Sequence, residues 1–317
     1  MSNYVIRRLL LAVPTILGVS LIIFAIMRFI PGDAVDIMIQ DNPQFWTPQF
    51  LADVRESMGL DKPIHHQYLI WIGNALKGDF GLSYWQRRPV VGMLKDRFPR
   101  SIELAVLAGT MAFTIGVSVG ILSAIKQDTW IDYVVRVWSI GGLSLPSFFT
   151  ATVLIYAMLR VFHWIPPLEY VPLWENPMEN LAQFIWPALI LSYGASAPIA
   201  RMTRSQVLEV IRQDYIRTAR SKGLAEKMVI WRHTLKNALL PVVTIGGIQV
   251  GHLLGGVVIL ERIFVIPGMG TGILDAVQWR DYPAISAFVL VLALIFVAAN
   301  LIVDLLYGWL DPRIRYD

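Results

Sequence analysis

The segment RMTRSQVLEVIRQDYIRTARSKGLAEKMVIWRHTLKNALLP, residues 201–241, is a long polar stretch between two strongly apolar ones. It holds nine basic residues against three acidic ones, Glu209, Asp214 and Glu226. Lys and Arg in a short loop between membrane spans keep that loop on the cytoplasmic side. Apolar residues recur at helical spacing on both sides of Gly223. The segment therefore predicts two short helices joined by a glycine turn at the cytoplasmic face of a membrane.

The composition places most of the chain in a membrane. Of 317 residues, 56% are hydrophobic and 16% are charged, which leaves too little polar surface to cover a soluble core of this size. Cysteine is absent, which excludes disulfides, thiolate metal sites and cysteine nucleophiles. The net charge of +4 comes largely from the central segment. It indicates membrane orientation and a partner surface rather than nucleic acid, because no folded polar domain presents a groove.

The apolar residues come in blocks of about 20, which is the length that a helix needs to cross the hydrocarbon layer. These blocks predict six spans, with both termini in the cytoplasm. The predicted spans are residues 9–27, 104–125, 138–159, 184–200, 239–260 and 284–306. We expect the third to be broken near Gly141, Gly142 and Pro146, and the fourth is the shortest. The first is interpreted as a retained signal anchor. The alternative, a cleavable signal peptide, would have a shorter apolar core and a prompt cleavage site.

The predicted fold class is an all-α polytopic membrane protein whose parts follow these spans. Residues 1–30 form an N-terminal transmembrane helix, and residues 31–100 form a small extracytoplasmic segment between helices 1 and 2. Residues 101–310 form the transmembrane domain of helices 2–6, including the cytoplasmic loop 201–238, and residues 311–317 form a cytoplasmic tail. The external loop 261–283 is expected to be compact, and its glycine-rich stretch at 268–272 is interpreted as a turn.

The fifth span carries the candidate residues of a translocation path. Gly247, Gly251 and Gly255 are spaced four apart, so they form a smooth face that another helix approaches closely. Gln249 and His252 lie in the same span, where a polar side chain is costly unless it meets a partner or water. Lining of the path and a plain interhelical hydrogen bond are equal alternatives for these two. Prolines in five places favour a bundle that rearranges: Pro14, Pro146, Pro187, Pro198 and Pro241.

Catalytic and nucleotide-binding motifs are absent from the sequence. It has no G-x-x-x-x-G-K-[ST] phosphate loop, no His-Glu-x-x-His zinc pattern and no G-x-S-x-G turn. We therefore expect no catalytic residue, no metal site and no cofactor in this chain. Two other classes stay open. A stand-alone channel or secondary transporter would carry intramembrane acids or an inverted repeat, and a membrane-embedded enzyme would carry paired reactive residues at membrane depth.

The order of residues in the central segment resembles the cytoplasmic loop of binding-protein-dependent ABC importer permeases. In that family the loop carries a Glu-Ala-Ala motif with Gly six residues after the Glu. Gly223 and Ala219 match it, whereas Arg217 replaces the Glu and Thr218 the first Ala. The stretch RTARSKGL at 217–224 is similar to the dipeptide and oligopeptide branch. Further similar stretches occur along the chain: RRLL (7–10), PGD (31–33), GDFGLS (78–83), LPSF (145–148), ARMTR (200–204), ERIFVIPGMG (261–270), RDYP (280–283) and DPRIR (311–315).

The resemblance implies a B-type permease of the dipeptide, oligopeptide and nickel group, with the type I ABC importer permease fold, in a prokaryotic cell membrane. It implies a homologous second permease, two cytoplasmic ATPase subunits that hold ATP and Mg²⁺, and an extracytoplasmic solute-binding protein. Peptides are the expected substrate, and nickel or another small solute is the alternative. The loop would then couple the chain to an ATPase through nine residues: Asp214, Arg217, Thr218, Ala219, Arg220, Lys222, Gly223, Leu224 and Glu226.

Overall fold

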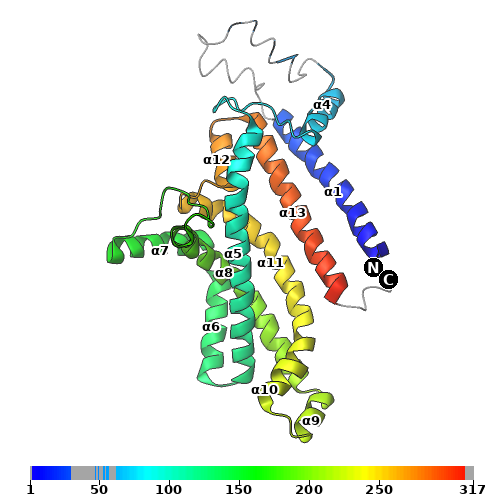
Figure 1. The fold of residues 1–317 in the computed structure, drawn as a ribbon, viewed down its shortest axis with the longest axis vertical. Coiled ribbons are helices and arrows are strands. Elements are labelled where there is room, and N and C mark those ends of the chain that lie inside the picture. The colour runs from blue at the N-terminus through cyan, green and yellow to red at the C-terminus, as the bar shows by residue number, and fades with distance from the viewer. Residues whose placement is uncertain are drawn as a thin grey trace. The chain divides into compact units, whose positions relative to one another are not determined.

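The computed structural model describes residues 2–29 and 62–310, with a few single positions between 47 and 56. The predicted tail 311–317 and much of the predicted extracytoplasmic segment lie outside these residues. The described chain is helical almost throughout (Figure 1). Its elements are α1 (Ser2–Phe29), α4 (Ile64–Leu76), α5 (Val90–Ile125), α6 (Trp130–Ser144), α7 (Ser147–Phe162), α8 (Pro177–Ile211), α9 (Asp214–Ser221), α10 (Glu226–Met228), the π-helix η1 (Val229–Thr234), α11 (Leu235–Ile263), α12 (Met269–Gln278) and α13 (Tyr282–Leu310).

The described residues divide into two compact units. Unit 1 is built mainly from Ile102–Ile266, and unit 2 from the described parts of Ile6–Ser101 together with Pro267–Ala298. The boundary falls inside α5 and inside α13, so each of these helices contributes to both units. One boundary of these units, between Ser101 and Ile102, falls next to the predicted boundary at residue 100, and the predicted domain division stays a prediction.

Four helical segments of the described chain are long and apolar enough to cross a membrane: Ile6–Arg28, Val90–Ile125, Glu226–Ile263 and Tyr282–Leu305. They contain the predicted first, second, fifth and sixth spans. A fifth candidate is the pair α6 and α7, which pass the test only together. The predicted fourth span lies in α8, which is not among these candidates, so the six-span count stays a prediction.

The third predicted span, residues 138–159, is broken near Pro146, as the sequence predicted. The break that the sequence indicated is present: α6 ends at Ser144, α7 begins at Ser147, and the two helices meet at an angle of 104°. Pro146 lacks a backbone N–H, and it forces the preceding residue out of helical geometry. Leu145 accordingly has an extended conformation, with φ −89° and ψ 120°. The prolines in α1, α8 and α11 lie inside continuing helices.

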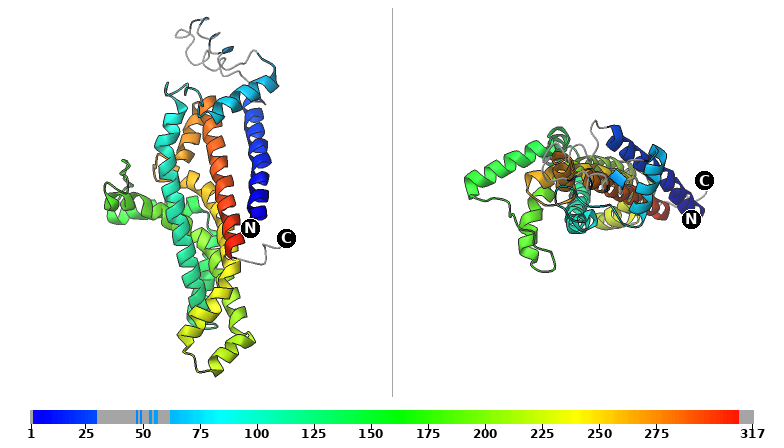
Figure 2. Two further views of the ribbon diagram at one scale, coloured as in Figure 1. Left: turned by 45° about the vertical axis from the view of Figure 1, so that its right-hand side comes forward. Right: turned by 90° about the horizontal axis from the view of Figure 1, so that it is seen from above.

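Helix α8 lies at the centre of unit 1, packed against α11, α6 and α7 (Figure 2). Sixteen of its 35 residues are buried inside the protein. Its serines bond to their own backbone: Ser192 Oγ donates to Leu189 O at 2.9 Å, and Ser196 Oγ donates to Tyr193 O at 2.8 Å. Polar residues satisfied in this way lower the hydropathy of α8 without exposing a polar group to its neighbours. Burial therefore explains why α8 falls short of the apolarity of a lipid-exposed span.

Helices α5 and α8 approach each other at two glycines of α5. A Cβ atom on Gly120 would lie 2.6 Å from both Ala200 O and Thr203 Cβ, and one on Gly116 would lie 2.7 Å from Ile199 Cγ2. Small residues at such positions let helix backbones come into direct contact. The glycines of α5 therefore determine how closely it packs on α8.

Unit 2 is held by a loop after α4 that packs on α12 and the start of α13. The Trp85 and Trp279 rings stack at 3.6 Å, and Ser83 Oγ donates to the buried Asp281 carboxylate. At the start of α12, Arg97 donates to Gly268 O at 3.2 Å. The stretch 268–272 was interpreted as a turn, and this is wrong: Gly268 is the N-cap of α12, and the glycines after it lie in the helix. Close packing explains their presence, because a Cβ on Gly272 would lie 2.7 Å from the Phe288 ring.

We predict that Gly120→Ala destabilises the protein by about 1–3 kcal/mol, because the added methyl group meets backbone and a β-branched side chain in a closely packed contact. Gly92→Ala in the same helix is the matched control, since a Cβ there has no neighbour within 4 Å. The midpoint of thermal unfolding in detergent measures both. Equal midpoints for the two variants would contradict the close α5–α8 contact.

Candidate functional site

The predicted coupling segment forms a hairpin at one end of unit 1, beyond the turn between α5 and α6 (Figures 1 and 2). We call Asp214–Met228, which comprises α9, the connecting turn and α10, the α9–α10 hairpin. Helix α8 ends at Ile211, and Gln213 is extended with ψ 152° before α9 begins. After α10 the chain continues through η1 into α11. The hairpin is therefore attached to the bundle by α8 on one side and by α11 on the other.

One face of α9 attaches the hairpin to the bundle. Ile216 is fully buried and Ala219 is 7% exposed, three residues apart and so on the same side of the helix. They belong to a hydrophobic cluster with residues of α5, α8, η1 and α11: Ala124, Val207, Val210, Val229, Ile230, Leu235 and Ala238. Beside them, Tyr215 Oη accepts a hydrogen bond from Asn237 Nδ2 at 2.8 Å. A displacement of α9 therefore acts directly on the ends of α8 and α11.

A glycine-based C-cap closes α9. Gly223 has φ +77°, the left-handed region in which side chains with a Cβ are strained. Its N–H donates to Arg220 O at 2.9 Å, and the Leu224 N–H donates to Ala219 O at 3.4 Å. These two bonds are those of a Schellman motif, and the Leu224 side chain packs against the cluster that includes Ala219. The turn predicted from the sequence is therefore confirmed in its detailed geometry.

The two limbs of the hairpin are joined by an ion pair that the sequence analysis did not foresee. Arg220 donates from Nε and Nη2 to the Glu226 carboxylate, at 3.0 and 2.5 Å. This carboxylate raises the pKa of Arg220 above its ordinary value. Both side chains are about half exposed, so the pair contributes at most about 1 kcal/mol. Its role is to orient the connecting turn rather than to hold the fold.

The structure brings all nine predicted coupling residues into this hairpin, on different faces. Seven are exposed: Asp214, Arg217, Thr218, Arg220, Lys222, Gly223 and Glu226. Arg217 contacts Asp214 at 3.5 Å in a pair whose side chains are 79% and 95% exposed. Ala219 instead faces the bundle, and Leu224 is half-buried. The outer face of the hairpin is therefore polar and basic, and its inner face is apolar.

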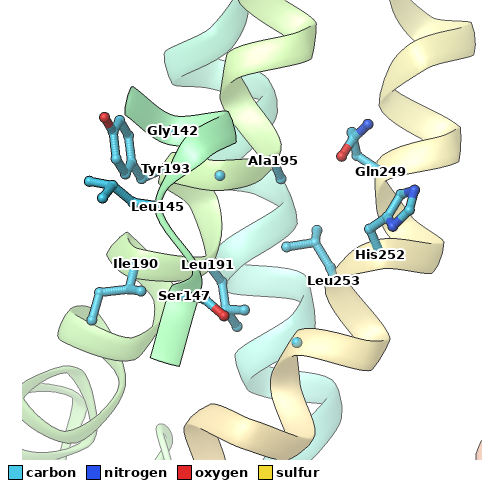
Figure 3. A pocket seen from close by; sticks show the side chains of 12 residues that line it. Gly142, Leu145, Ser147, Ile190, Leu191, Tyr193, Ala195, Gln249, His252 and Leu253 are labelled. Atoms are coloured by element: carbon cyan, nitrogen blue, oxygen red, sulfur yellow. The ribbon is translucent and has the colours of Figure 1, made fainter. Parts of the chain in front are cut away.

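A pocket of about 210 Å³ lies between the α6–α7 break, α8 and α11 (Figure 3). Gln249 and His252, predicted for the translocation path, both line it from α11. Gly251 and Gly255 are outside its lining, whereas Gly256 belongs to it. A Cβ on Gly256 would lie 2.8 Å from Leu191 Cδ2, and one on Gly255 would meet no atom of the described residues within 4 Å. Gly256 rather than Gly255 is therefore the glycine at which α11 lies close to α8.

The opposite wall of the pocket comes from the break after α6 and from the middle of α8. Gly142, Leu145 and Ser147 supply the first part, and Tyr193 with its neighbours supplies the second (Figure 3). Tyr193 Oη donates to Trp138 O at 2.9 Å. The wall thus contains backbone that is not helical at Leu145. Such backbone is tolerated at membrane depth where it lies in protein or faces a cavity.

A buried charge cluster is the feature that the sequence analysis missed. We call Ser123, Asp132, Arg136 and Arg204 the Asp132 cluster. The fully buried Asp132 carboxylate accepts from Arg204 Nε and Nη2, both at 2.8 Å. It also accepts from Ser123 Oγ at 2.5 Å and from Arg136 Nη2 at 2.5 Å. Asp132 lies between the predicted second and third spans and was not singled out from the sequence. The one available signal was the acid–arginine spacing of four residues between Asp132 and Arg136, which says nothing of Arg204, 72 residues away.

Similarity to known proteins agrees with this geometry. The pattern of the family described as binding-protein-dependent transport system inner membrane component matches residues 116–316, and that of its N-terminal region matches residues 1–105. The chain is 38% identical to the dipeptide transport system permease protein DppB of Alkalihalophilus pseudofirmus, over 336 aligned positions that cover 100% of both chains. It is 37% identical to the glutathione transport system permease protein GsiC of Escherichia coli strain K12, over 316 positions and 100% of both chains.

The fold has a solved counterpart. In the inward-facing structure of the MetNI methionine ABC transporter, one chain superposes with a TM-score of 0.53 and 17% identity, covering 69% of this chain and 96% of that one. The fold is thus that of an ABC importer permease, in a multi-pass protein of the bacterial inner membrane. The chain belongs to the family of binding-protein-dependent transport system inner membrane components.

We predict that Gly223→Val weakens the hairpin and that Gly223→Asn does not. A β-branched residue in the left-handed region costs about 1–2 kcal/mol, whereas Asn tolerates that region. Both side chains point into open space, so strain of the backbone is the difference between them. Amide hydrogen exchange in residues 214–224 should rise in the Val variant and stay near wild type in the Asn variant. Equal exchange in both would show that the turn does not require the left-handed conformation.

Proposed function

We propose that this chain is a translocating subunit of an ATP-driven peptide importer, and that the α9–α10 hairpin receives force from a separate ATPase. The observation that carries the proposal is the two-faced hairpin: Ile216 and Ala219 bind it to the ends of α8 and α11, while Arg217 and Lys222 stay on its exposed basic face. A protein without a phosphate loop of its own uses ATP only through contact with a chain that has one. A rigid polar hairpin outside the bundle suits that contact.

The proposed topology has six spans with both termini in the cytoplasm. Support comes from α8, a 35-residue helix that is about 52 Å long at 1.5 Å per residue and so exceeds the hydrocarbon thickness of about 30 Å. Counting α8 as a span that is surrounded by protein, together with the α6–α7 pair, gives six. Residues 31–100 then lie outside the cell, and the hairpin lies inside, as its excess of Lys and Arg requires.

The proposed assembly contains a homologous second permease, two ATPase subunits that hold ATP and Mg²⁺, and an extracytoplasmic binding protein. The family description itself refers to binding-protein-dependent transport. The importer fold shared with the MetNI chain supports the place of this chain in such an assembly. We assign no cofactor to this chain. The nine hairpin residues are proposed as the ATPase-coupling site.

Peptides are the proposed substrate class. Two relatives that match over their full lengths are named as dipeptide and glutathione permeases, and both names refer to molecules joined by amide bonds. Gln249 and His252 supply polar groups of the kind that such substrates require, in a pocket whose other residues are largely apolar. We propose these two as residues of the translocation path, with Gly251 and Gly255 on the same helix.

The proposed mechanism is alternating access between two states. Closure of the ATPase pair displaces the hairpin, and the hairpin moves the connected ends of α8 and α11. Because both helices line the pocket, their tilt changes the side of the membrane to which the pocket opens. ATP shifts the equilibrium between the two states only through its different contacts with each of them.

We predict that the purified chain alone in liposomes accumulates no peptide, and that uptake requires the second permease, both ATPases, the binding protein and ATP. The reason is that energy reaches this chain only through the hairpin contact. Uptake of a radiolabelled dipeptide into sealed vesicles is the measurement. Transport by the chain alone would identify a stand-alone transporter and reject the proposal.

We predict that Gln249→Leu, which removes the polar group at similar volume, reduces peptide uptake by the full assembly roughly tenfold, the effect of losing one hydrogen bond of about 1.4 kcal/mol. Thr244→Val is the matched control, since Thr244 is an exposed residue of α11 outside the pocket whose hydroxyl bonds to Leu240 O. Initial uptake rates over a range of peptide concentrations measure both variants. Equal rates in the Leu and Val variants would remove Gln249 from the path.

A further inference from the structure

The Asp132 cluster joins three helices at a single carboxylate. Ser123 belongs to the end of α5, Asp132 to the first turn of α6, and Arg204 to α8. Asp132 is completely buried, and the two bonds from Arg204 have the parallel geometry in which guanidinium and carboxylate bind best. A buried carboxylate that loses such a partner is left uncompensated, so separation of the helices here is strongly unfavourable.

The cluster stands next to the hairpin in the chain. Arg204 is seven residues before Ile211, where α8 ends, and α9 begins three residues later. The hydrophobic cluster under the hairpin includes Ala124 of α5, the neighbour of Ser123. A movement of the hairpin therefore reaches the ends of α5, α8 and α11 directly, and the contacts that hold α6 to α8 carry it to α6.

Above the cluster the same three helices are in direct contact through small residues. A Cβ on Gly120 of α5 would lie 2.6 Å from Thr203 Cβ, and one on Gly142 of α6 would lie 3.1 Å from Ala197 Cβ. No layer of long flexible side chains separates the backbones at these contacts. Closely packed interiors of this kind deform little and transmit displacement. At the far end of this contact, Gly142 of α6 and Tyr193 of α8 line the pocket.

We propose that Asp132 and Arg204 are positioning residues that make α5, α6 and α8 move as one body, so that displacement of the hairpin reaches the α6 wall of the pocket. The inference rests on the proposed function, since it presumes that the hairpin is the point where force enters. Without the Asp132–Arg204 contact, α8 follows the hairpin while α6 lags behind. ATP hydrolysis then continues, and less substrate crosses for each ATP consumed.

The first test compares two arginines that bind the same carboxylate. Arg204→Gln removes the charged contact between Asp132 of α6 and α8. Arg136→Gln removes a contact within α6, because Arg136 and Asp132 are four residues apart in that helix. In the full assembly with ATPases and binding protein, peptide uptake per ATP hydrolysed should fall at least tenfold in Arg204→Gln and stay within twofold of wild type in Arg136→Gln. Arg204→Lys keeps the charge but has a single nitrogen to donate. Its uptake per ATP hydrolysed should lie between the values of Arg204→Gln and Arg136→Gln.

These outcomes separate positioning from a general structural role. A purely structural role would lower the amount of assembled complex and leave uptake per ATP unchanged in the complex that remains. Complex yield is therefore measured beside uptake and hydrolysis. Normal uptake per ATP in Arg204→Gln, or an equal fall in Arg136→Gln, overturns the inference.

The second test uses the absence of cysteine from this chain. A pair of substitutions, Gly142→Cys and Ala197→Cys, places two thiols where the Cβ atoms are close enough for a disulfide after a small shift. Because Gly142 lines the pocket, the reduced pair sets the reference level of uptake per ATP in each background. If α6 and α8 move as one body, oxidation leaves uptake per ATP at that reference level when Arg204 is present, and raises it above that level in Arg204→Gln. The reduced pair in each background is the control. Loss of uptake on oxidation in the wild-type background overturns the inference, because it shows that α6 and α8 must slide past each other.

The result that would reject the proposed function differs from the results that would overturn this inference. Uptake by the chain alone in liposomes would reject it whatever the Arg204 variants do. Normal coupling in Arg204→Gln beside uncoupling in Gly223→Val overturns the inference about the Asp132 cluster and leaves the proposed function in place.

Discussion

The structure of unit 1 depends on the burial of α8 among its neighbours. Every backbone polar group at membrane depth needs a partner within the protein, and α8 meets this need by forming one continuous helix of 35 residues despite Pro187 and Pro198. Glycines of the neighbouring helices allow a close approach to α8, at Gly116 and Gly120 of α5 and at Gly142 of α6. A larger residue at these contacts would displace a helix rather than a side chain. The hairpin and the pocket both take their positions from this packing, because α8 leads directly into the first and forms a wall of the second.

Two ion pairs in the same unit show how burial sets the role of a charge. Arg220 and Glu226 are about half exposed, so water competes for both and the pair fixes a local geometry at small energetic gain. Asp132 has no exposed surface, and its desolvation is offset only when several donors surround it. A pair of the first kind is separated at little cost in free energy. Separation of a cluster of the second kind leaves a buried charge uncompensated and is strongly unfavourable.

The pocket forms where regular structure is interrupted. Pro146 separates α6 from α7, and the extended Leu145 leaves a hollow that α8 and α11 only partly fill. Its volume of about 210 Å³ is below the roughly 300–1,000 Å³ typical of pockets for small ligands. The exposed Gly255 lies on the same helix as Gln249 and His252. Among the described residues, no atom lies within 4 Å of the position of a Cβ on Gly255.

The sequence by itself determined the helical class, the membrane location, four of the spans and the glycine turn of the hairpin. These follow from local properties: hydropathy over about 20 residues, and the one residue type that adopts φ +77° without strain. It also indicated the break at Pro146, since proline acts on its immediate neighbours. The 104° angle at that break, the start of α12 at Gly268 and the inward position of Ala219 depended on which surfaces meet. The Asp132 cluster belongs wholly to this second kind. Its two central residues, Asp132 and Arg204, are 72 positions apart in the sequence. Only the packing of α6 on α8 buries the Asp132 carboxylate against the Arg204 guanidinium.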